Sequence, residues 1–206
     1  ADIIGESSLW LEVDLLDLMN SIFKSLALNN LLIKINNRKI LEGIFDSFSN
    51  NLDFSQFCII IDKLDKIGFK KIETLLLEGG FANKDVDFIK QLFLSKISFA
   101  DKKEYILSQL TLNENLKTGF NELSFIFDKI SGMSLNQNIE VDFSLARGLD
   151  YYTGSIFEVV SESSAGSLLG GGRYDQLTQK FNIGDISGVG ISFGLDRIYL
   201  LLEEYN

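Results

Sequence analysis

The expected fold is determined by three segments in the C-terminal part of the chain: ARGLDYYTGSIFE (146–158), GGGRYDQL (170–177) and GVGISFGLDRI (188–198). SIFEVV (155–160) and GVGISFGL (188–195) have the apolar and β-branched composition of strands. We expect GGGRYDQL to be a glycine-rich turn that leads into a helix. Every second residue of GVGISFGL is small, so one face of that strand is nearly bare. A bare face suits a planar group lying on a sheet, and it suits a closely packed helix equally well.

The rest of the chain predicts two further strands and a series of helices. LLIKIN (31–36) and IEVDFSLA (139–146) are the expected strands. Apolar residues at a spacing of three and four predict helices at Ser8–Leu28, Arg38–Phe48, 54–67, 69–80, 83–96, 101–131 and Asp196–Tyr205. Together these elements predict an α+β fold, an antiparallel sheet with flanking helices. We expect residues 1–54 and 136–206 to form a core, and residues 55–135 to form a helical insertion.

Composition excludes several kinds of chemistry. The charged residues give a net charge of −10, and histidine is absent, so the chain can form neither a Ser-His-Asp triad nor an imidazole metal site. Cys58 is the only cysteine, which excludes an internal disulfide and fits a reducing compartment. No apolar run reaches the ~18 residues of a membrane span. We expect a soluble cytoplasmic protein with no membrane partner, and the missing initiator methionine suggests a piece of a longer chain.

Arginines beside glycines form the strongest chemical signal. Only four of the 19 basic residues lie after position 135, and three of them are arginines next to glycine-rich segments: Arg147, Arg173 and Arg197. A guanidinium group binds carboxylate or phosphate with two parallel hydrogen bonds, and glycine lets a ligand approach the backbone closely. The pattern therefore predicts an anionic ligand held by converging arginines. The alternative is that each arginine pairs with the acid nearest to it in the sequence.

The three segments, in this order and at this spacing, resemble the histidyl-tRNA synthetases of class II. ARGLDYYTGSIFE is similar to the histidine-recognition signature of that family, and GVGISFGLDRI is similar to its motif 3. KINNRKIL (34–41) and IDKLDKIG (61–68) also resemble the family. The resemblance implies a class II synthetase-like antiparallel sheet with an all-helical insertion domain. It also implies ATP-dependent activation of histidine to histidyl-adenylate and transfer to tRNA(His).

The resemblance further implies roles for individual residues. Arg147 would be catalytic, contacting the histidine carboxylate and the α-phosphate, and Arg197 would hold the γ-phosphate. The histidine-binding residues would be Asp2, Arg147, Tyr151, Tyr152 and Tyr174. The ATP-binding residues would be Arg197, Gly190, Gly194 and Glu158, with the glycines beneath the adenine. Mg²⁺ is expected with ATP, and no residue is expected to ligate a metal. Without the resemblance, Asp2 reads equally as an ordinary acid near a chain end.

The chain also departs from the family pattern. Motif 1, which forms much of the dimer interface, and motif 2, with its ATP-binding arginine, are not found in the 206 residues. We therefore expect a fragment that is inactive alone, from a homodimeric enzyme whose partners are L-histidine, ATP and tRNA(His). The alternative is the synthetase-like regulatory subunit of ATP phosphoribosyltransferase in histidine biosynthesis. Arg147, Arg197 and the helical insertion argue against that alternative, because a non-catalytic relative does not need phosphate-binding arginines.

Overall fold

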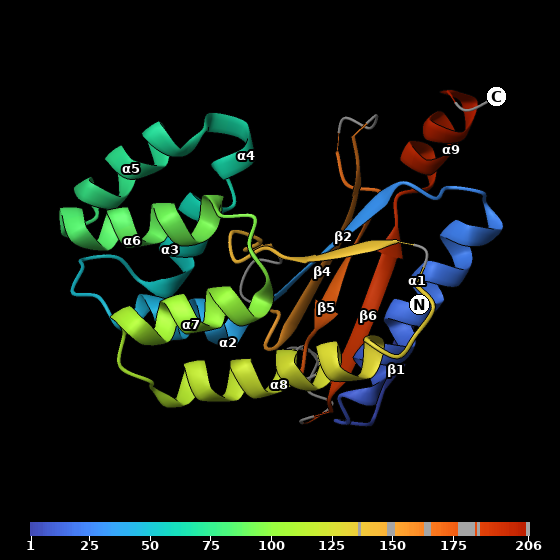
Figure 1. Ribbon diagram of the computed structural model, residues 1–206, viewed down its shortest axis with the longest axis horizontal. Coiled ribbons are helices and arrows are strands. Elements are labelled where there is room, and N and C mark those ends of the chain that lie inside the picture. Colours follow the sequence, from blue (N-terminus) through green and yellow to red (C-terminus); the bar gives the residue numbers. More distant parts are fainter. Residues whose placement is uncertain (136, 148–150, 163–165, 177–183, 185, 205–206) are drawn as a thin grey trace.

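The computed structural model describes residues 1–206 except 136, 148–150, 163–165, 177–183, 185 and 205–206. It contains a six-stranded sheet with helices packed beside it (Figure 1), which confirms the α+β class. The strand order is β1-β6-β5-β4-β2-β3. The strands are β1 (Asp2–Ile4), β2 (Leu31–Asn37), β3 (Asn138–Val141), β4 (Ser155–Ser161), β5 (Leu169–Arg173) and β6 (Gly188–Phe193).

The sheet is mixed, although most neighbouring strands run antiparallel. β2 pairs antiparallel with β4, and β4, β5, β6 and β1 continue in the same way. β3 instead pairs parallel with β2, with Ile33 opposite Ile139. A parallel neighbour needs a long crossover connection, and the helical residues between β2 and β3 supply it. The expected strand over 139–146 is also too long: it ends at Val141, because the Asp142 carboxylate accepts the amide N–H of Ser144 in a turn.

The segment GGGRYDQL does not begin as a turn. Its three glycines belong to β5, in the interior of the sheet between β4 and β6. A Cβ atom on Gly171 would lie 2.3 Å from the carbonyl oxygen of Gly190, and one on Gly172 would lie 2.5 Å from that of Ser155. Gly171 and Gly172 therefore let neighbouring strands approach closely, which is a reason for glycine in a strand that periodicity does not reveal. The helix expected after this segment falls on residues outside the described ranges.

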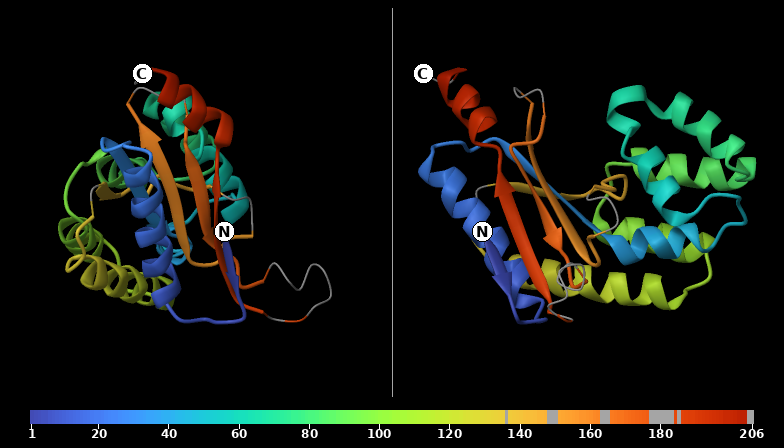
Figure 2. Two further views of the ribbon diagram at one scale, coloured as in Figure 1. Left: turned by 90° about the vertical axis from the view of Figure 1, so that its right-hand side faces the viewer. Right: turned by 180° about the vertical axis from the view of Figure 1, so that it is seen from behind.

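One face of the sheet carries the apolar core. α1 (Trp10–Ser25) packs against β6, and α8 (Glu114–Ile130) packs against β2 and α1. Figure 2 shows both helices on the same side of the sheet. Fully or almost fully buried side chains fill this layer, among them Phe23, Ile33, Ile35, Phe157, Val159, Val189 and Leu16. The opposite face of β4, β5 and β6 is consequently free to carry polar groups.

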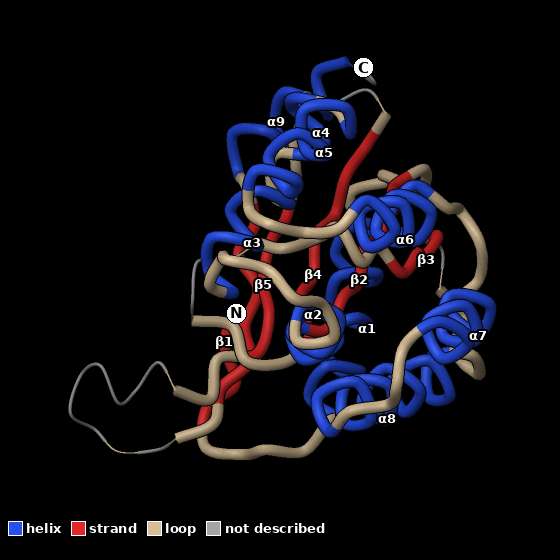
Figure 3. Tube along the Cα trace, turned by 90° about the vertical axis from the view of Figure 1, so that its left-hand side faces the viewer, coloured by secondary structure: helices blue, strands red, loops and turns tan. Residues whose placement is uncertain are grey.

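Most of the remaining helices lie together beside the sheet, nearest the viewer in Figure 3, and α2 of this group packs against α8 and β2. They are α2 (Arg38–Phe45), α3 (Phe54–Ile61), α4 (Leu64–Ile67), α5 (Phe69–Glu78), α6 (Asn83–Leu94) and α7 (Phe99–Gln109), and α9 (Leu195–Glu204) follows β6. Phenylalanine rings fill the interior of this group, with Phe57 stacked on Phe81 at 5.7 Å between ring centroids. Among the described residues, no helix combines the length and apolar character needed to cross a membrane.

Two expected helices are interrupted. The helix expected over 54–67 consists of α3 and α4, separated by a turn at Asp62 and Lys63. The helix expected over 101–131 consists of α7 and α8, because Leu110 is extended and Asn113 begins a new helix by accepting the amide N–H of Leu116. The final helix is confirmed up to Glu204.

Candidate active site

The candidate site lies on the face of the sheet opposite α1. Cross-strand partners point to the same face, so the register aligns Lys34, Glu158, Gly170 and Ser192 in one row across β2, β4, β5 and β6. A neighbouring row contains Gly172, Gly190 and Asp2. Polar side chains and glycines thus occupy this face, whereas the intervening residues of the same strands fill the core.

A hollow of about 290 Å³ opens on this face. It is lined by Asp2, Tyr151, Tyr152, Gly170, Tyr174, Gly190, Ile191 and Ser192. The structure therefore brings together Asp2 and the three tyrosines expected to bind histidine, from β1, the segment before β4, and the end of β5. The hydroxyl of Tyr174 donates to Oδ1 of Asp2 at 2.6 Å. The rings of Tyr151 and Tyr152 lie 4.2 Å apart between centroids.

Glycine is required at two positions on β6 beside this hollow, because a side chain there would overlap with the residues that line it. A Cβ atom on Gly190 would lie 1.9 Å from Oδ1 of Asp2, and one on Gly188 would lie 2.3 Å from the ring of Tyr174. Burial raises the pKa of Tyr152 above its usual value, and its contact with Tyr151 raises it further. Burial and the bond to Asp2 likewise raise the pKa of Tyr174. Both phenols therefore stay protonated and can donate hydrogen bonds at neutral pH.

Next to the hollow, Arg147 and Arg197 converge on Ser167. Nη1 of Arg147 donates to Oγ of Ser167 at 2.8 Å, and Nη1 of Arg197 donates to the Ser167 carbonyl at 2.7 Å and its Oγ at 3.5 Å. Nη2 of Arg147 forms an ion pair with Oε1 of Glu158 at 2.5 Å. Two guanidinium groups thus share one hydroxyl, beside a buried carboxylate.

The electrostatics of this cluster favour an anion. The side chain of Arg147 is 43% exposed, whereas that of Glu158 is only 5% exposed. Burial raises the pKa of the Glu158 carboxyl, and the Arg147 and Lys34 cations offset this only in part. Gly194 lies at the start of the helix that carries Arg197, and its amide N–H donates to the Leu168 carbonyl at 2.8 Å. The exposed cations leave room for a negatively charged ligand on the open face.

A second, larger hollow of about 520 Å³ lies between the sheet and helices α3 and α4. Arg147 and Glu158 line it, together with Lys34, Arg38 and Asp142. Because Glu158 is the cross-strand neighbour of Gly170, which lines the smaller hollow, the two hollows meet at adjacent strands, about 4.8 Å apart. Arg147 therefore lines the larger hollow, and its ion-pair partner Glu158 lies on the strand next to Gly170 of the smaller one.

Arg173 does not join this cluster, which corrects the expectation that all three arginines surround one ligand. Its side chain points toward α1, on the other face of the sheet, and is 4% exposed. Nε and Nη2 donate to the two carboxylate oxygens of Glu12 at 2.6 and 2.7 Å. In this case the alternative, an arginine paired with acids, is correct. One partner, Asp175, is the nearest acid in the sequence, but the main partner is Glu12.

Sequence reasoning missed Ser167 and Glu12. Ser167 lies at the entrance to β5, and its role depends on two arginines that are 20 and 30 positions away. Glu12 lies on α1, 161 positions from Arg173, and reads as one of several acids on an amphipathic helix. A feature that could have singled out Glu12 is its place among the apolar residues that face the core.

A twisted, mostly antiparallel sheet with an arginine-flanked hollow on its open face is the arrangement of a class II aminoacyl-tRNA synthetase core, as the resemblance in the sequence indicated. The comparison with protein families agrees: the family described as "Histidyl-tRNA synthetase" matches residues 1–198. The chain therefore belongs to the histidyl-tRNA synthetase family.

Relatives and solved structures are consistent with this assignment. The chain is 44% identical over 207 residues to the histidine–tRNA ligase of Flavobacterium johnsoniae and 40% identical over 199 residues to that of Porphyromonas gingivalis. These alignments cover 99% and 96% of this chain, but 44% of each relative. The chain thus spans less than half the length of these curated relatives.

Among solved structures, a histidyl-tRNA synthetase from Nostoc sp. superposes with a TM-score of 0.87 at 29% identity, over 99% of this chain and 49% of that one. A Bacillus halodurans protein described as an ATP phosphoribosyltransferase regulatory subunit/histidyl-tRNA synthetase superposes with a TM-score of 0.82 at 20% identity. That match covers 100% of this chain and 52% of the other. This second likeness establishes the fold alone.

Proposed function

We propose that this chain is part of a histidine–tRNA ligase and carries its histidine pocket and part of its ATP site. The observation that carries the proposal is the adjacency of two features on one open face of the sheet. One is a small hollow lined by phenols and the Asp2 carboxylate, and the other is the pair of guanidinium groups at Ser167. Family membership gives the proposal its substrates: L-histidine, ATP and tRNA(His).

The hollow suits an amino acid that carries an imidazole ring. Its volume of about 290 Å³ is at the lower limit of the range for drug-sized ligands. The Asp2 carboxylate accepts a hydrogen bond from an N–H group of the imidazole ring. The hydroxyl of Tyr152, which stays protonated at neutral pH, contacts the same ring. An amino acid without these ring nitrogens leaves polar groups of the pocket unpaired, and such sites discriminate strongly against it.

The reaction proposed for the whole protein needs no nucleophile from the enzyme. A carboxylate oxygen of histidine attacks the α-phosphorus of ATP, the bond to the β-phosphate oxygen breaks, and pyrophosphate leaves. A hydroxyl at the 3′ end of the tRNA then attacks the activated carbonyl carbon, the bond from that carbon to the phosphate oxygen breaks, and AMP and the hydroxyl proton are released. Catalysis therefore depends on positioning and charge stabilisation, which fits a chain without histidine.

Each arginine has a defined role in this proposal. Arg147 exchanges part of its contact with Glu158 and Ser167 for the substrate carboxylate and the α-phosphate, stabilising the charge that develops there. Arg197, held at its other side by the Ser167 carbonyl, binds the γ-phosphate. Gly194 flanks the surface beneath the adenine, and Glu158 orients Arg147. Gly190, which was expected beneath the adenine as well, instead lines the smaller hollow proposed for histidine, next to Asp2.

Further partners follow from the family. Among the described residues there is no cluster of His, Cys, Asp and Glu side chains that could hold a metal ion. We therefore propose that Mg²⁺ enters with ATP, ligated by phosphate oxygens. We also propose that the whole protein is a cytoplasmic homodimer, and that residues 55–135 form an insertion domain facing tRNA, with residues 1–54 and 136–206 in the catalytic core.

The chain alone is proposed to bind histidine without completing the reaction, because it spans 44% of the length of its relatives and motifs 1 and 2 are not found in it. Calorimetric titration of the chain with L-histidine, L-glutamine and L-phenylalanine tests the pocket. If the chain binds L-histidine but neither of the other two amino acids, the proposal is supported. If it shows no preference for L-histidine, the proposal is contradicted. An ATP–pyrophosphate exchange rate near that of a full-length ligase would contradict the proposed inactivity.

The regulatory-subunit alternative has weaker support. The Bacillus halodurans structure shares the fold at 20% identity, whereas the two ligases named above are 44% and 40% identical. Purification of the whole protein from its source distinguishes the two functions. Association with tRNA(His) supports the ligase, and association with a phosphoribosyltransferase supports the alternative.

A further inference from the structure

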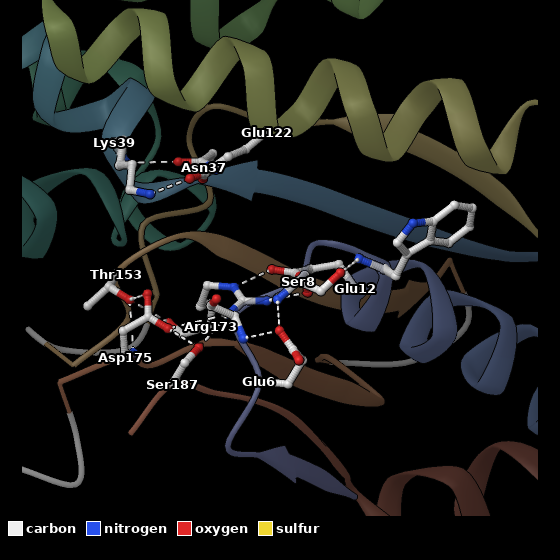
Figure 4. Close-up of polar contacts among 12 residues, drawn as sticks. Glu6, Ser8, Glu12, Asn37, Lys39, Glu122, Thr153, Arg173, Asp175 and Ser187 are labelled. Atoms are coloured by element: carbon white, nitrogen blue, oxygen red, sulfur yellow. Dashed lines mark hydrogen bonds and ion pairs between the residues drawn. The ribbon is translucent and has the colours of Figure 1, made fainter. Parts of the chain in front are cut away.

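The buried Arg173 is the centre of a hydrogen-bond network that is fully satisfied. All its N–H groups have acceptors: the two Glu12 oxygens, the Ser8 carbonyl at 3.1 Å from Nη2, and Ser187 Oγ and Asp175 Oδ1 at 2.7 and 3.3 Å from Nη1. Figure 4 shows these contacts converging on Arg173. With every donor used, Arg173 has no hydrogen bond left for a ligand.

The network continues from Arg173 to the segment before β4. The Thr153 hydroxyl donates to Oδ2 of Asp175 at 3.0 Å and accepts the Asp175 amide N–H at 3.0 Å. The Thr153 amide N–H donates to the Arg173 carbonyl at 2.8 Å. Ser187 completes the ring by donating from Oγ to Oδ1 of Asp175 at 2.6 Å. Three segments far apart in the sequence are thus tied to one guanidinium group.

Three of the residues that line the smaller hollow, Tyr152, Tyr174 and Asp2, lie next to this network. Tyr152 directly precedes Thr153, and Tyr174 lies between Arg173 and Asp175 in the chain. On the third side, the carbonyl of Ser187 accepts the amide N–H of Gly5 at 2.9 Å, one residue beyond the strand that carries Asp2. The network therefore lies behind the hollow, one residue from its phenols, without contributing a side chain to its lining.

Stability alone does not explain this arrangement. A buried ion pair carries a desolvation penalty that offsets much of its attraction, so apolar residues of similar volume would hold the fold about as well. Apolar contacts are non-directional, however, whereas hydrogen bonds at 2.6 to 3.3 Å fix the angle as well as the distance of the atoms they join. A pocket that must place two hydroxyls and a carboxylate around a small ring needs that angular precision.

We propose that Arg173, Asp175 and Thr153 are positioning residues that hold Tyr152 and Tyr174 at the orientation required for recognising histidine. The inference rests on the proposed function, since it assigns these residues to the same pocket. Arg173 fixes the end of β5 against Glu12, Asp175 transmits this position to Thr153, and Thr153 orients the preceding tyrosine.

Thr153→Val tests the inference, because it removes the hydroxyl and keeps the shape of the side chain. We expect the dissociation constant for L-histidine to rise about tenfold in the 206-residue chain. Thr153→Ser restores the hydroxyl and should recover most of the affinity. Glu122→Gln is the matched control: Glu122 binds Lys39 and accepts from Nδ2 of Asn37 at 2.6 Å, between α8 and α2. It should lower the melting temperature without changing histidine affinity.

A second measurement does not depend on histidine. The tyrosines absorb differently when ionised, so an alkaline absorbance titration reports the surroundings of Tyr152 and Tyr174. Burial raises the pKa of Tyr152 and Tyr174, so these phenols ionise at the highest pH. Thr153→Val should lower their pKa by admitting water to the hollow, and Glu122→Gln should not.

The outcomes separate the two proposals. If the unmodified chain fails to bind L-histidine, the proposed function is wrong, and the tyrosine titration still decides whether the network positions the phenols. If Thr153→Val binds histidine normally, or if it changes neither affinity nor titration beyond what Glu122→Gln does, the positioning role is wrong.

Discussion

Arg147 and Arg173 have similar neighbours in the sequence but different surroundings in the structure. Each is adjacent to glycine, and each has an aspartate two or three positions later. The side chain of Arg173 is 4% exposed on the face of the sheet that α1 covers, whereas that of Arg147 is 43% exposed on the open face. The local sequence therefore does not determine whether an arginine supports the fold or can bind a ligand; the face of the sheet does.

The physical reason lies in desolvation. A buried guanidinium group must find an acceptor for each N–H, because each unsatisfied donor costs about 1–3 kcal/mol. Arg173 meets this requirement within the protein. A half-exposed guanidinium group can leave donors to water, and a carboxylate or phosphate can later replace that water.

The largest effect expected from this contrast is on stability. Arg173→Met should lower the free energy of unfolding by about 3–5 kcal/mol, because it leaves the Glu12 carboxylate buried without its partner. Urea unfolding followed by circular dichroism measures the change. The double variant with Glu12→Leu should recover a substantial part of the loss, because it removes both charges. If Arg173→Met and Arg147→Met destabilise the chain equally, the contrast between the two arginines is wrong.

The second effect concerns catalysis and the open face. In the whole protein, Arg147→Lys should reduce adenylate formation by about 10²–10³-fold, because an ammonium group cannot reproduce the two parallel contacts of a guanidinium group. ATP–pyrophosphate exchange measures the rate, and urea unfolding should change little. Unaltered exchange in this variant would remove Arg147 from the role proposed here.

The ion pair of Lys34 and Asp142 is intermediate in burial between Arg173 and Arg147. The two side chains are 18% and 12% exposed, and Nζ of Lys34 lies 2.8 Å from Oδ2 of Asp142. Although burial raises the pKa of Asp142, Lys34 and Ser144 hold it below the ordinary 3.8. Burial also lowers the pKa of Lys34, but Asp142 raises it above 10.5 overall. The stability that the Asp142 carboxylate contributes to the folded state is thus fully present above pH 3.8, and it is lost as the pH falls through the lower pKa of Asp142 in the folded protein. The stability that the Lys34 ammonium group contributes is fully present below pH 10.5, and it is lost as the pH rises through the higher pKa of Lys34 in the folded protein.

Lys34→Met should therefore cost about 1.5–3 kcal/mol of unfolding free energy at neutral pH, the usual range for a charged hydrogen bond. Urea midpoints measured across the pH range should show the difference from the unmodified chain shrinking at both acidic and strongly alkaline pH. A difference that is independent of pH would show that the stem of Lys34, rather than its charge, provides the stabilisation.

The sequence predicts the parts of the fold in which side chains alternate or repeat. β2, β4 and β6 and the helices follow from apolar periodicity because one side of each faces a common core. β5 could not be predicted in this way, since Gly170, Gly171 and Gly172 have no side chains from which to read a period. For Gly171 and Gly172 the reason for glycine is the close approach of Gly190 and Ser155 from neighbouring strands, which only the assembled sheet reveals.

The site was predictable to a similar extent. Asp2, Tyr151, Tyr152 and Tyr174 were expected together from the family resemblance, and they line one hollow. Their roles in binding remain predictions. Ser167 and Glu12 could not be predicted, because each acts through partners that only the tertiary fold places beside it.

The smallest expected effect comes from removing one oxygen atom on the open face, the hydroxyl of Tyr152. Tyr152→Phe removes a hydroxyl from the hollow and keeps the ring, so in the whole protein the affinity for L-histidine should fall about tenfold, corresponding to about 1.4 kcal/mol. ATP affinity should change little, because the phosphate-binding groups are Arg147 and Arg197. Tyr199→Phe on α9 is the control, since Tyr199 is 58% exposed and its hydroxyl donates to Glu203. Calorimetry with both ligands distinguishes a structural role of Tyr152 from a role in ligand recognition. An equal loss of affinity for histidine and ATP would mean that Tyr152 supports the fold of the open face. A loss of affinity for histidine alone would mean that its hydroxyl contacts the ligand.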